Sequence, residues 1–164
     1  MTIRFGILTL SDRSSRGERA DSSGPALARL IEAEGWSVTK QSLLPDDESS
    51  LREILIEWSD SFALDVILTT GGTGFSPKDV TPEATRAVIE REAPGLAEAM
   101  RAASLKITPH AMLSRIVTGI RKKTLIINLP GSPKGAVESL QVVMPVLNHA
   151  IQLLNEDPKS ETSH

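Results

Sequence analysis

Short apolar runs rich in β-forming residues alternate along this chain with segments whose apolar residues recur at helical spacing. Strands that alternate with helices in this way form a mostly parallel sheet with helices on both faces. We therefore predict an α/β domain of three layers, α/β/α. The last two runs follow each other without a helix between them, which predicts an antiparallel edge. The predicted strands are residues 3–10, 36–44, 65–70, 115–120 and 124–129.

Proline and hydroxyl side chains mark where the helices should begin, because proline suits the first turn and serine or threonine can cap it. One helix should run from Thr81 until the sequence Ala93-Pro94-Gly95 breaks it and starts another, which continues through Ala103. The last helix should be kinked at Pro145, which removes one backbone hydrogen bond. The other expected starts are Ser23-Gly24-Pro25, a cap at Ser49 or Ser50, and Pro130-Gly131-Ser132-Pro133.

The length of 164 residues and an apolar fraction of 40% fit one domain with its own core. We place this domain at residues 1–154 and expect the polar residues 155–164 to form a flexible tail. No apolar run approaches the roughly 20 residues of a membrane span, and the first residues lack the layout of a signal peptide. We therefore expect a soluble, cytoplasmic protein without a membrane partner.

The charge balance and the aromatic content argue against nucleic-acid binding. Lys and Arg number 18 against 21 Asp and Glu, which gives a net charge of −3. A pI near 5.6 does not suit a partner whose phosphates demand a basic face. Three Phe, two Trp and no Tyr are too few for a stacking platform. The absence of cysteine excludes a disulfide scaffold, a cysteine-ligated zinc site and a thiol nucleophile.

The most informative segment is residues 69–85, TTGGTGFSPKDVTPEAT, which follows a predicted buried strand. Three glycines in four residues let the backbone approach a ligand closely, and successive amides in such a turn can bind an anion. The helix start at Thr81 would add unpaired amides. Pro77 stands where both the Walker loop and the dinucleotide fingerprint require glycine, so neither is supported. A plain glycine turn is the alternative.

Carboxylates and a lysine accompany the predicted phosphate loops. Asp46 follows the second predicted strand and Asp79 lies in the glycine-rich loop, so both should reach the same edge of the sheet. Carboxylates repel a bare phosphate, whereas Mg²⁺ binds one or two of them together with phosphate oxygens. Lys134 at a helix start is easier to understand if an anion binds there, although it can also be a solvated lysine. Asp47 and Glu48 could replace Asp46, while Asp12 and Asp21 have ordinary turn or capping explanations.

The three histidines, His110, His149 and His164, are too scattered in the sequence to predict a metal site or a catalytic triad.

Several motifs, taken in order, resemble those of the MogA/MoaB family of molybdenum-cofactor biosynthesis proteins. The resemblance covers the chain to about Leu154. Part of the chain is especially similar to the gephyrin-type catalytic domain. The first loop is more charged than the family pattern, which leaves Arg16 and Arg19 without an assigned role. The motifs are Ser11-Asp12-Arg13, Asp21-Ser22-Ser23-Gly24-Pro25, Leu44-Pro45-Asp46, Thr69 to Gly74, Asp79 to Thr85, Ser104 to Pro109, Met112 to Arg115, and Asn128 to Pro133.

The resemblance implies a molybdopterin adenylyltransferase, which converts molybdopterin and Mg-ATP to adenylyl-molybdopterin and pyrophosphate. It implies that Asp46 and Asp79 are catalytic and bind Mg²⁺. It also implies a homotrimer and a downstream molybdenum insertase as partner. The residues implied for nucleotide phosphates are Thr70, Gly71, Gly72, Thr73, Gly74 and Thr81. Those implied for molybdopterin are Ser11, Ser104, Ser114, Pro130, Gly131, Ser132 and Lys134.

Some MoaB-branch relatives bind the pterin without catalysing the transfer, so a molybdopterin carrier is the main alternative. The presence of both Asp46 and Asp79 favours the active branch. A trimeric scaffold and a hydrolase of another nucleotide are further alternatives, although the chain has no partner domain or long linker.

Overall fold

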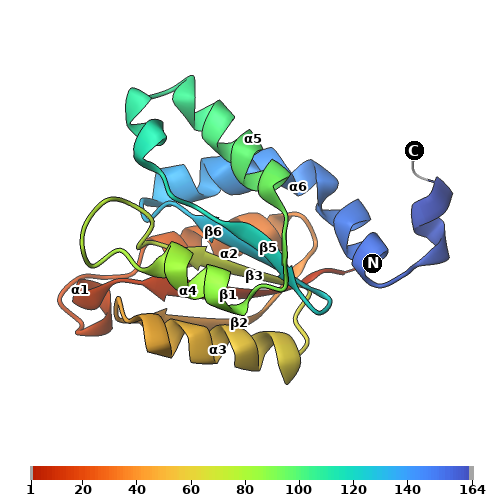
Figure 1. The fold of residues 1–164 in the computed structure, drawn as a ribbon, viewed down its shortest axis with the longest axis horizontal. Helices are drawn as coiled ribbons and strands as arrows, with labels where there is room; N and C mark the ends of the chain where they lie inside the picture. Colours follow the sequence, from red (N-terminus) through yellow and green to blue (C-terminus); the bar gives the residue numbers. More distant parts are fainter. Residues whose placement is uncertain (1, 163–164) are drawn as a thin grey trace.

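The computed structural model describes residues 2–162, which form a single layered α/β unit (Figure 1). Its strands are β1 (Arg4–Leu10), β2 (Ser37–Leu44), β3 (Val66–Thr70), β4 (Arg91–Glu92), β5 (Thr118–Arg121) and β6 (Thr124–Leu129). They form a six-stranded sheet in the order β2-β1-β3-β6-β5-β4. The β2, β1, β3 and β6 strands are parallel, whereas β5 and β4 add an antiparallel edge. The predicted fold class is confirmed.

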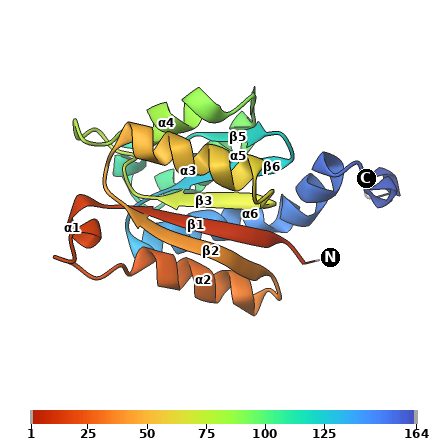
Figure 2. The same cartoon turned by 90° about the horizontal axis from the view of Figure 1, so that it is seen from below.

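The helices cover both faces of this sheet, as Figure 2 shows for α2 on one side and α3 and α4 on the other. Because side chains alternate along a strand, neighbouring residues serve different cores. Ile7 of β1 packs with α2, α5 and α6, while Leu8 packs with α3 and α4. The helices are α1 (Asp12–Ser15), α2 (Ser23–Ala33), α3 (Glu48–Asp60), α4 (Thr81–Val88), α5 (Pro94–Leu105) and α6 (Pro133–Leu154), with 3-10 helices η1 (Pro109–Leu113) and η2 (Pro158–Thr162).

The chain order of the strands places a topological switch point between β1 and β3. From β1 the chain passes to the edge strand β2, and it then returns to β3 on the other side of β1. In open α/β sheets, ligands bind beyond the carboxyl ends of strands at such a point. The loops after β1, β2, β3 and β6 meet there, because these strands are parallel.

Two predicted helix caps were wrong. The cap of α3 is Asp47, whose carboxylate accepts hydrogen bonds from the amide and the hydroxyl of Ser50, each shorter than 3 Å. Ser49 and Ser50 therefore lie inside the helix. Thr81 is the first residue of α4 rather than its cap, and its hydroxyl donates to the carbonyl of Gly71 at 2.9 Å. The loop after β1 also contains a short helix, α1, that was not predicted.

The helix from Thr81 ends at Val88, earlier than predicted, because the backbone becomes extended at Ile89. The Glu90 amide then donates to Ile120 and the Ala93 amide to Thr118. This backbone pairing forms β4, so tertiary contacts override the local helical tendency.

The predicted strand at 115–120 is shifted to Thr118–Arg121. The amides before it have other partners: Arg115 donates to the carbonyl of Thr73, and Val117 donates to the side chain of Asn128. Neither amide is therefore available for the ladder, although the carbonyl of Val117 accepts a hydrogen bond from the Asn128 amide at 3.1 Å.

Helix α6 continues through Pro145 to Leu154. The flexible tail remains a prediction: η2 covers Pro158–Thr162, and residues 163–164, including His164, lie outside the described residues. No helix within residues 2–162 is long and apolar enough to cross a membrane.

Candidate functional site

A polar cleft of about 520 Å³ lies at the carboxyl ends of the parallel strands. It is built by the segments that follow β1, β2, β3 and β6, so it straddles the switch point. We call it the polar cleft. Its lining residues include Thr9, Leu10, Ser11, Ser14, Arg19, Asp21, Ser23, Asp46, Thr70, Gly71, Gly72, Asp79, Gly131, Ser132 and Pro133.

Backbone atoms of three loops touch at the floor of the polar cleft. Gly71 has a φ of 102°, a conformation that favours glycine, and a Cβ there would collide with the carbonyl oxygen of Leu10. A Cβ on Gly131 would lie 3.2 Å from the Cα of Gly71. Side-chain hydroxyls hold the loops together, because Thr70 donates to the Pro130 carbonyl and Ser23 to the Gly131 carbonyl, both at 2.6 Å. The glycines predicted to approach a ligand thus also approach one another.

Asp46 and Asp79 both line the polar cleft, as predicted from their places after β2 and β3. The Asp46 amide donates to the Asp12 carboxylate at 2.8 Å, and the Asp12 amide donates back to Asp46 at 3.3 Å. Burial raises the pKa of the Asp46 carboxyl, and the nearby charges of Asp12 and Asp79 add to this effect, although the Asp12 amide opposes it. The amide of Asp12 and the charge of Lys78 thus only partly offset the effect of burial on the Asp46 carboxylate.

The carboxylates of Asp46 and Asp79 fit a Mg²⁺ ion that also binds oxygens of a phosphate ligand. Lys78 lies 3.6 Å from the carboxylate of Asp12, and no described basic side chain forms an ion pair with Asp46 or Asp79. Within residues 2–162, no three His, Asp or Glu side chains gather into a complete metal cage. Mg²⁺ commonly uses one or two carboxylates and takes its remaining ligands from water and substrate phosphates.

Arg115 fixes the loop that carries Asp79. Its guanidinium donates to the carbonyls of Gly74 and Asp79, at 2.8 and 2.7 Å, and to the carboxylate of Glu83 in α4 at 2.8 Å. The hydrogen bond to Glu83 also raises the pKa of Arg115. Because a guanidinium has several donors in one rigid plane, it can hold both ends of the loop and the helix behind it. Sequence reasoning assigned no role to Arg115, since its partners lie more than 30 residues away.

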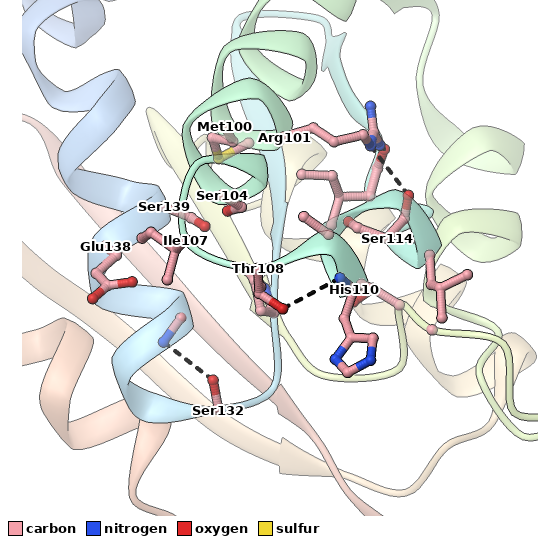
Figure 3. Close-up of a pocket in the computed structure, with 17 residues that line it drawn as sticks. Met100, Arg101, Ser104, Ile107, Thr108, His110, Ser114, Ser132, Glu138 and Ser139 are labelled. Atoms are coloured by element: carbon pink, nitrogen blue, oxygen red, sulfur yellow. Dashed lines mark hydrogen bonds between the residues drawn. The ribbon is translucent and has the colours of Figure 1, made fainter.

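A second cavity, of about 310 Å³, lies beside the polar cleft between α5, η1 and the start of α6. Figure 3 shows Met100 and Ser104 of α5, Ser139 and Glu138 of α6, and His110 of η1 around it, with Arg101 hydrogen-bonded to Ser114. We call it the α5–α6 pocket. Ser132 lines both cavities, so the two share a wall. The other lining residues include Thr73, Gly74, Ile107, Thr108, Ala111, Leu113, Ile116, Pro130, Gly135, Glu138 and Ser139.

Apolar side chains form much of the α5–α6 pocket, but polar groups face it at few points. The buried side chains of Met100 and Ile116 contribute apolar surface. Arg101 donates to the backbone carbonyls of Ser114 and Ile116, both at 3.2 Å. The hydroxyl of Ser114 is buried and has no hydrogen-bond partner in the described part of the chain. An apolar cavity with a few polar groups is typical of a site for a small organic ligand.

The structure divides the predicted site residues between the two cavities. Thr70, Gly71 and Gly72 line the polar cleft, whereas Thr73 and Gly74 turn into the α5–α6 pocket. Of the residues predicted for the pterin, Ser104, Ser114 and Pro130 line the α5–α6 pocket, Ser11 and Gly131 line the polar cleft, and Ser132 lines both.

Thr81 and Lys134 line neither cavity. Thr81 instead supports the glycine loop through its bond to Gly71. The ammonium group of Lys134 lies 4.0 Å from the carboxylate of Glu138, one turn along α6, and its side chain is 83% exposed. This contact is what a solvated lysine on a helix surface makes.

The sequence of this chain matches a known protein family. Residues 6–149 match the family model described as a probable molybdopterin binding domain. The chain belongs to this family. The matched part of this molybdopterin binding domain includes all of the parallel strands except the first two residues of β1, together with the loops that form the polar cleft.

The molybdopterin binding domain is similar to proteins of molybdenum-cofactor biosynthesis. It is 46% identical to gephyrin of Dictyostelium discoideum over 94% of this chain, but it spans only 23% of that protein. It is 40% identical to the molybdopterin adenylyltransferase of Helicobacter pylori (strain J99), with 93% of this chain and 88% of the relative covered. The crystal structure of the molybdopterin biosynthesis enzyme MoaB from Thermus thermophilus is 50% identical, with a TM-score of 0.90 and coverage of 96% and 99%. The predicted resemblance to the MogA/MoaB family is confirmed.

Proposed function

We propose that this domain is a molybdopterin adenylyltransferase that joins the adenylyl group of ATP to the phosphate of molybdopterin. The observation that carries the proposal is the shared wall between the two cavities. The polar cleft offers glycine loops and two carboxylates, and the adjacent α5–α6 pocket offers apolar surface with a few polar groups. Two substrates bound in these cavities would meet near Ser132. The adenylyltransferase relatives support the same assignment.

The polar cleft is the proposed site for the nucleotide phosphates. Asp46 and Asp79 would hold Mg²⁺, which when bound neutralises phosphate charge and aligns the polyphosphate. The amides of the glycine loop provide donors for phosphate oxygens. The α5–α6 pocket would hold the pterin, and the unpartnered Ser114 hydroxyl is available to a polar atom of its ring system.

In the proposed reaction, a phosphate oxygen of molybdopterin forms a bond to the α-phosphorus of ATP. The bond from that phosphorus to the oxygen bridging to the β-phosphate breaks, and its electron pair leaves with pyrophosphate. The attacking phosphate is already anionic, so no general base is required. The contribution of the protein is therefore to hold the two phosphates in line and to keep water out, which is positional and electrostatic catalysis.

The experiment that tests this proposal is anaerobic incubation of the protein with molybdopterin, Mg²⁺ and ATP, with adenylylated product and pyrophosphate both quantified. Asp79→Asn protein is the matched control. Product from the wild type alone supports the proposal. Pterin binding without product would favour the alternative, a MoaB-like carrier that binds molybdopterin without catalysis. If neither pterin binding nor product is detected, the proposal is wrong.

Replacing Arg115 by Ala should lower adenylyl transfer about 10- to 100-fold, the usual cost of losing an outer-shell partner of a metal site. The reason is that the loop carrying Asp79 loses its contacts with Gly74, Asp79 and Glu83. The loop should also become more sensitive to limited proteolysis. Arg115→Lys keeps the charge but not the planar fork, so we expect it to rescue little activity. Wild-type turnover with an intact loop in Arg115→Ala would contradict this role.

We further propose that the domain acts in the cytoplasm as a homotrimer that passes its product to a molybdenum insertase. Exposed apolar side chains on α5, on the turn after it, on η1 and on α6 support self-association, because neighbouring copies that covered them would remove them from water. These include Leu105, Ile107, Met112, Val146 and Leu153. Sedimentation equilibrium should give three times the chain mass of 17.7 kDa; a single species at the monomer mass would contradict the trimer.

A further inference from the structure

Arg19 lies in the loop between α1 and α2 and lines the polar cleft. Figure 2 shows α1 beyond the carboxyl end of β1. The ionisable residues among the cleft's described lining are Asp21, Asp46 and Asp79, which are acidic, and Arg19, which is basic. Arg19 is therefore the positive charge that the described lining offers to an anion. Sequence reasoning gave it no role.

The guanidinium of Arg19 keeps most of its donors available. Its single hydrogen bond in the described structure is a long one, 3.3 Å from Nη2 to the hydroxyl of Ser11, and no ion pair within residues 2–162 includes Arg19. The other basic groups nearby differ. Arg16 is bound by Glu18 at 2.8 Å and does not line the cleft, while Lys78 pairs with Asp12.

We propose that Arg19 binds the β- and γ-phosphates of ATP and stabilises pyrophosphate as it leaves. This inference rests on the proposed adenylyl transfer. The reacting α-phosphorus must lie near Ser132, where the polar cleft meets the α5–α6 pocket. Arg19 lines the polar cleft and not the α5–α6 pocket, so its guanidinium is placed for the polyphosphate of the nucleotide rather than for the pterin.

The chemistry of the leaving group explains why a guanidinium is suited to this position. As the bond between the α-phosphorus and the bridging oxygen breaks, negative charge accumulates on the departing diphosphate. Arg can donate two parallel hydrogen bonds to phosphate oxygens and remains charged at any physiological pH. Asp46 and Asp79 cannot stabilise this charge directly, because carboxylates repel phosphate without a bridging cation.

The test compares the binding of Mg-ATP, Mg-pyrophosphate and AMP to wild-type, Arg19→Ala and Arg19→Lys proteins by titration calorimetry. Arg16→Ala, in the same loop but outside the cleft, is the matched control. Loss of a charge-assisted phosphate contact should weaken ATP and pyrophosphate binding by about 10- to 100-fold in Arg19→Ala. AMP affinity should change less than about twofold, since AMP lacks the β- and γ-phosphates. Arg19→Lys should recover part of the loss, and Arg16→Ala should match the wild type.

Unchanged ATP and pyrophosphate affinities in Arg19→Ala would overturn the inference, as would an equal loss of AMP affinity, which would indicate damage to the whole cleft. Melting temperatures of the variants check their folding. A different result would contradict the proposed function and not the role of Arg19. In that case the wild-type protein would bind ATP but form no adenylylated product. Wild-type protein that binds neither ATP nor pyrophosphate would overturn both.

Discussion

Replacing Asp79 by Asn is expected to reduce adenylyl transfer about 100- to 1,000-fold, the range seen when a group that stabilises charge in the transition state is removed. The substitution removes the carboxylate charge proposed to hold Mg²⁺. It preserves the size of the side chain, and the Asn carbonyl can still accept the hydrogen bond from the Ser76 amide, at 3.1 Å in the wild type. The backbone carbonyl at this position also keeps its bond to Arg115.

The fold should therefore be unaffected by Asp79→Asn, and the melting temperature should stay within about 1–2 °C of the wild type. Turnover is measured from pyrophosphate release at saturating ATP over a range of Mg²⁺ concentrations. A loss that higher Mg²⁺ partly restores would indicate weakened metal binding. Full activity in the variant would show that Asp79 has no part in the reaction.

Replacing Asp46 by Asn is expected to lower activity by a similar factor but to make the protein slightly more stable at neutral pH. Burial raises the pKa of Asp46, so the folded protein binds this proton more tightly than the unfolded chain does. The stability gained from the protonated form is present in acid and is lost as the pH rises through the raised pKa. At neutral pH the ionised carboxylate thus lowers the free energy of unfolding, and neutral Asn removes that cost.

Thermal unfolding of wild-type and Asp46→Asn proteins over a pH series tests the sign of this effect. Asp46 is only partly buried, so solvent screening keeps the expected gain in melting temperature to about 1–3 °C at neutral pH. The gain should shrink as the pH falls toward the ordinary range for aspartate, where both proteins are neutral at this position. A variant that is less stable than the wild type at neutral pH would contradict the argument from burial.

The alternation of strands and helices was sufficient to predict the fold and to predict that Asp46 and Asp79 lie at the same edge of the sheet. Both residues follow parallel strands, whose carboxyl ends lie at one edge of the sheet for any conformation of the loops. The sequence pattern could not predict that the glycine loop is divided between the two cavities. Gly72 and Thr73 are neighbours, yet Gly72 lines the polar cleft and Thr73 lines the α5–α6 pocket. This direction depends on backbone angles set by contacts with Thr81 and Arg115.

The errors at helix ends share a cause with the missed functional residues. Residues with a hydroxyl side chain, such as Thr81, favour helix starts locally. The same hydroxyl can instead donate a hydrogen bond to a nearby carbonyl, as that of Thr81 does to Gly71. Arg115 and Arg19 are equally ordinary in sequence, since arginine is common on surfaces. Their significance comes from partners or cavities that only the folded chain brings within reach.

The junction of Leu10, Gly71 and Gly131 has a consequence for how members of this family can diverge. Because main-chain atoms meet there without room for a Cβ, the scaffold of the cleft floor persists as long as the two glycines do. The proposed chemistry, by contrast, depends on a few replaceable side chains that line the cleft, such as Asp46 and Asp79. A descendant of such a chain could lose one of the two carboxylates, and with it the proposed adenylyl transfer, and still keep the backbone that forms the floor of the polar cleft. Retention of a ligand is therefore a poor guide to retention of turnover in this architecture.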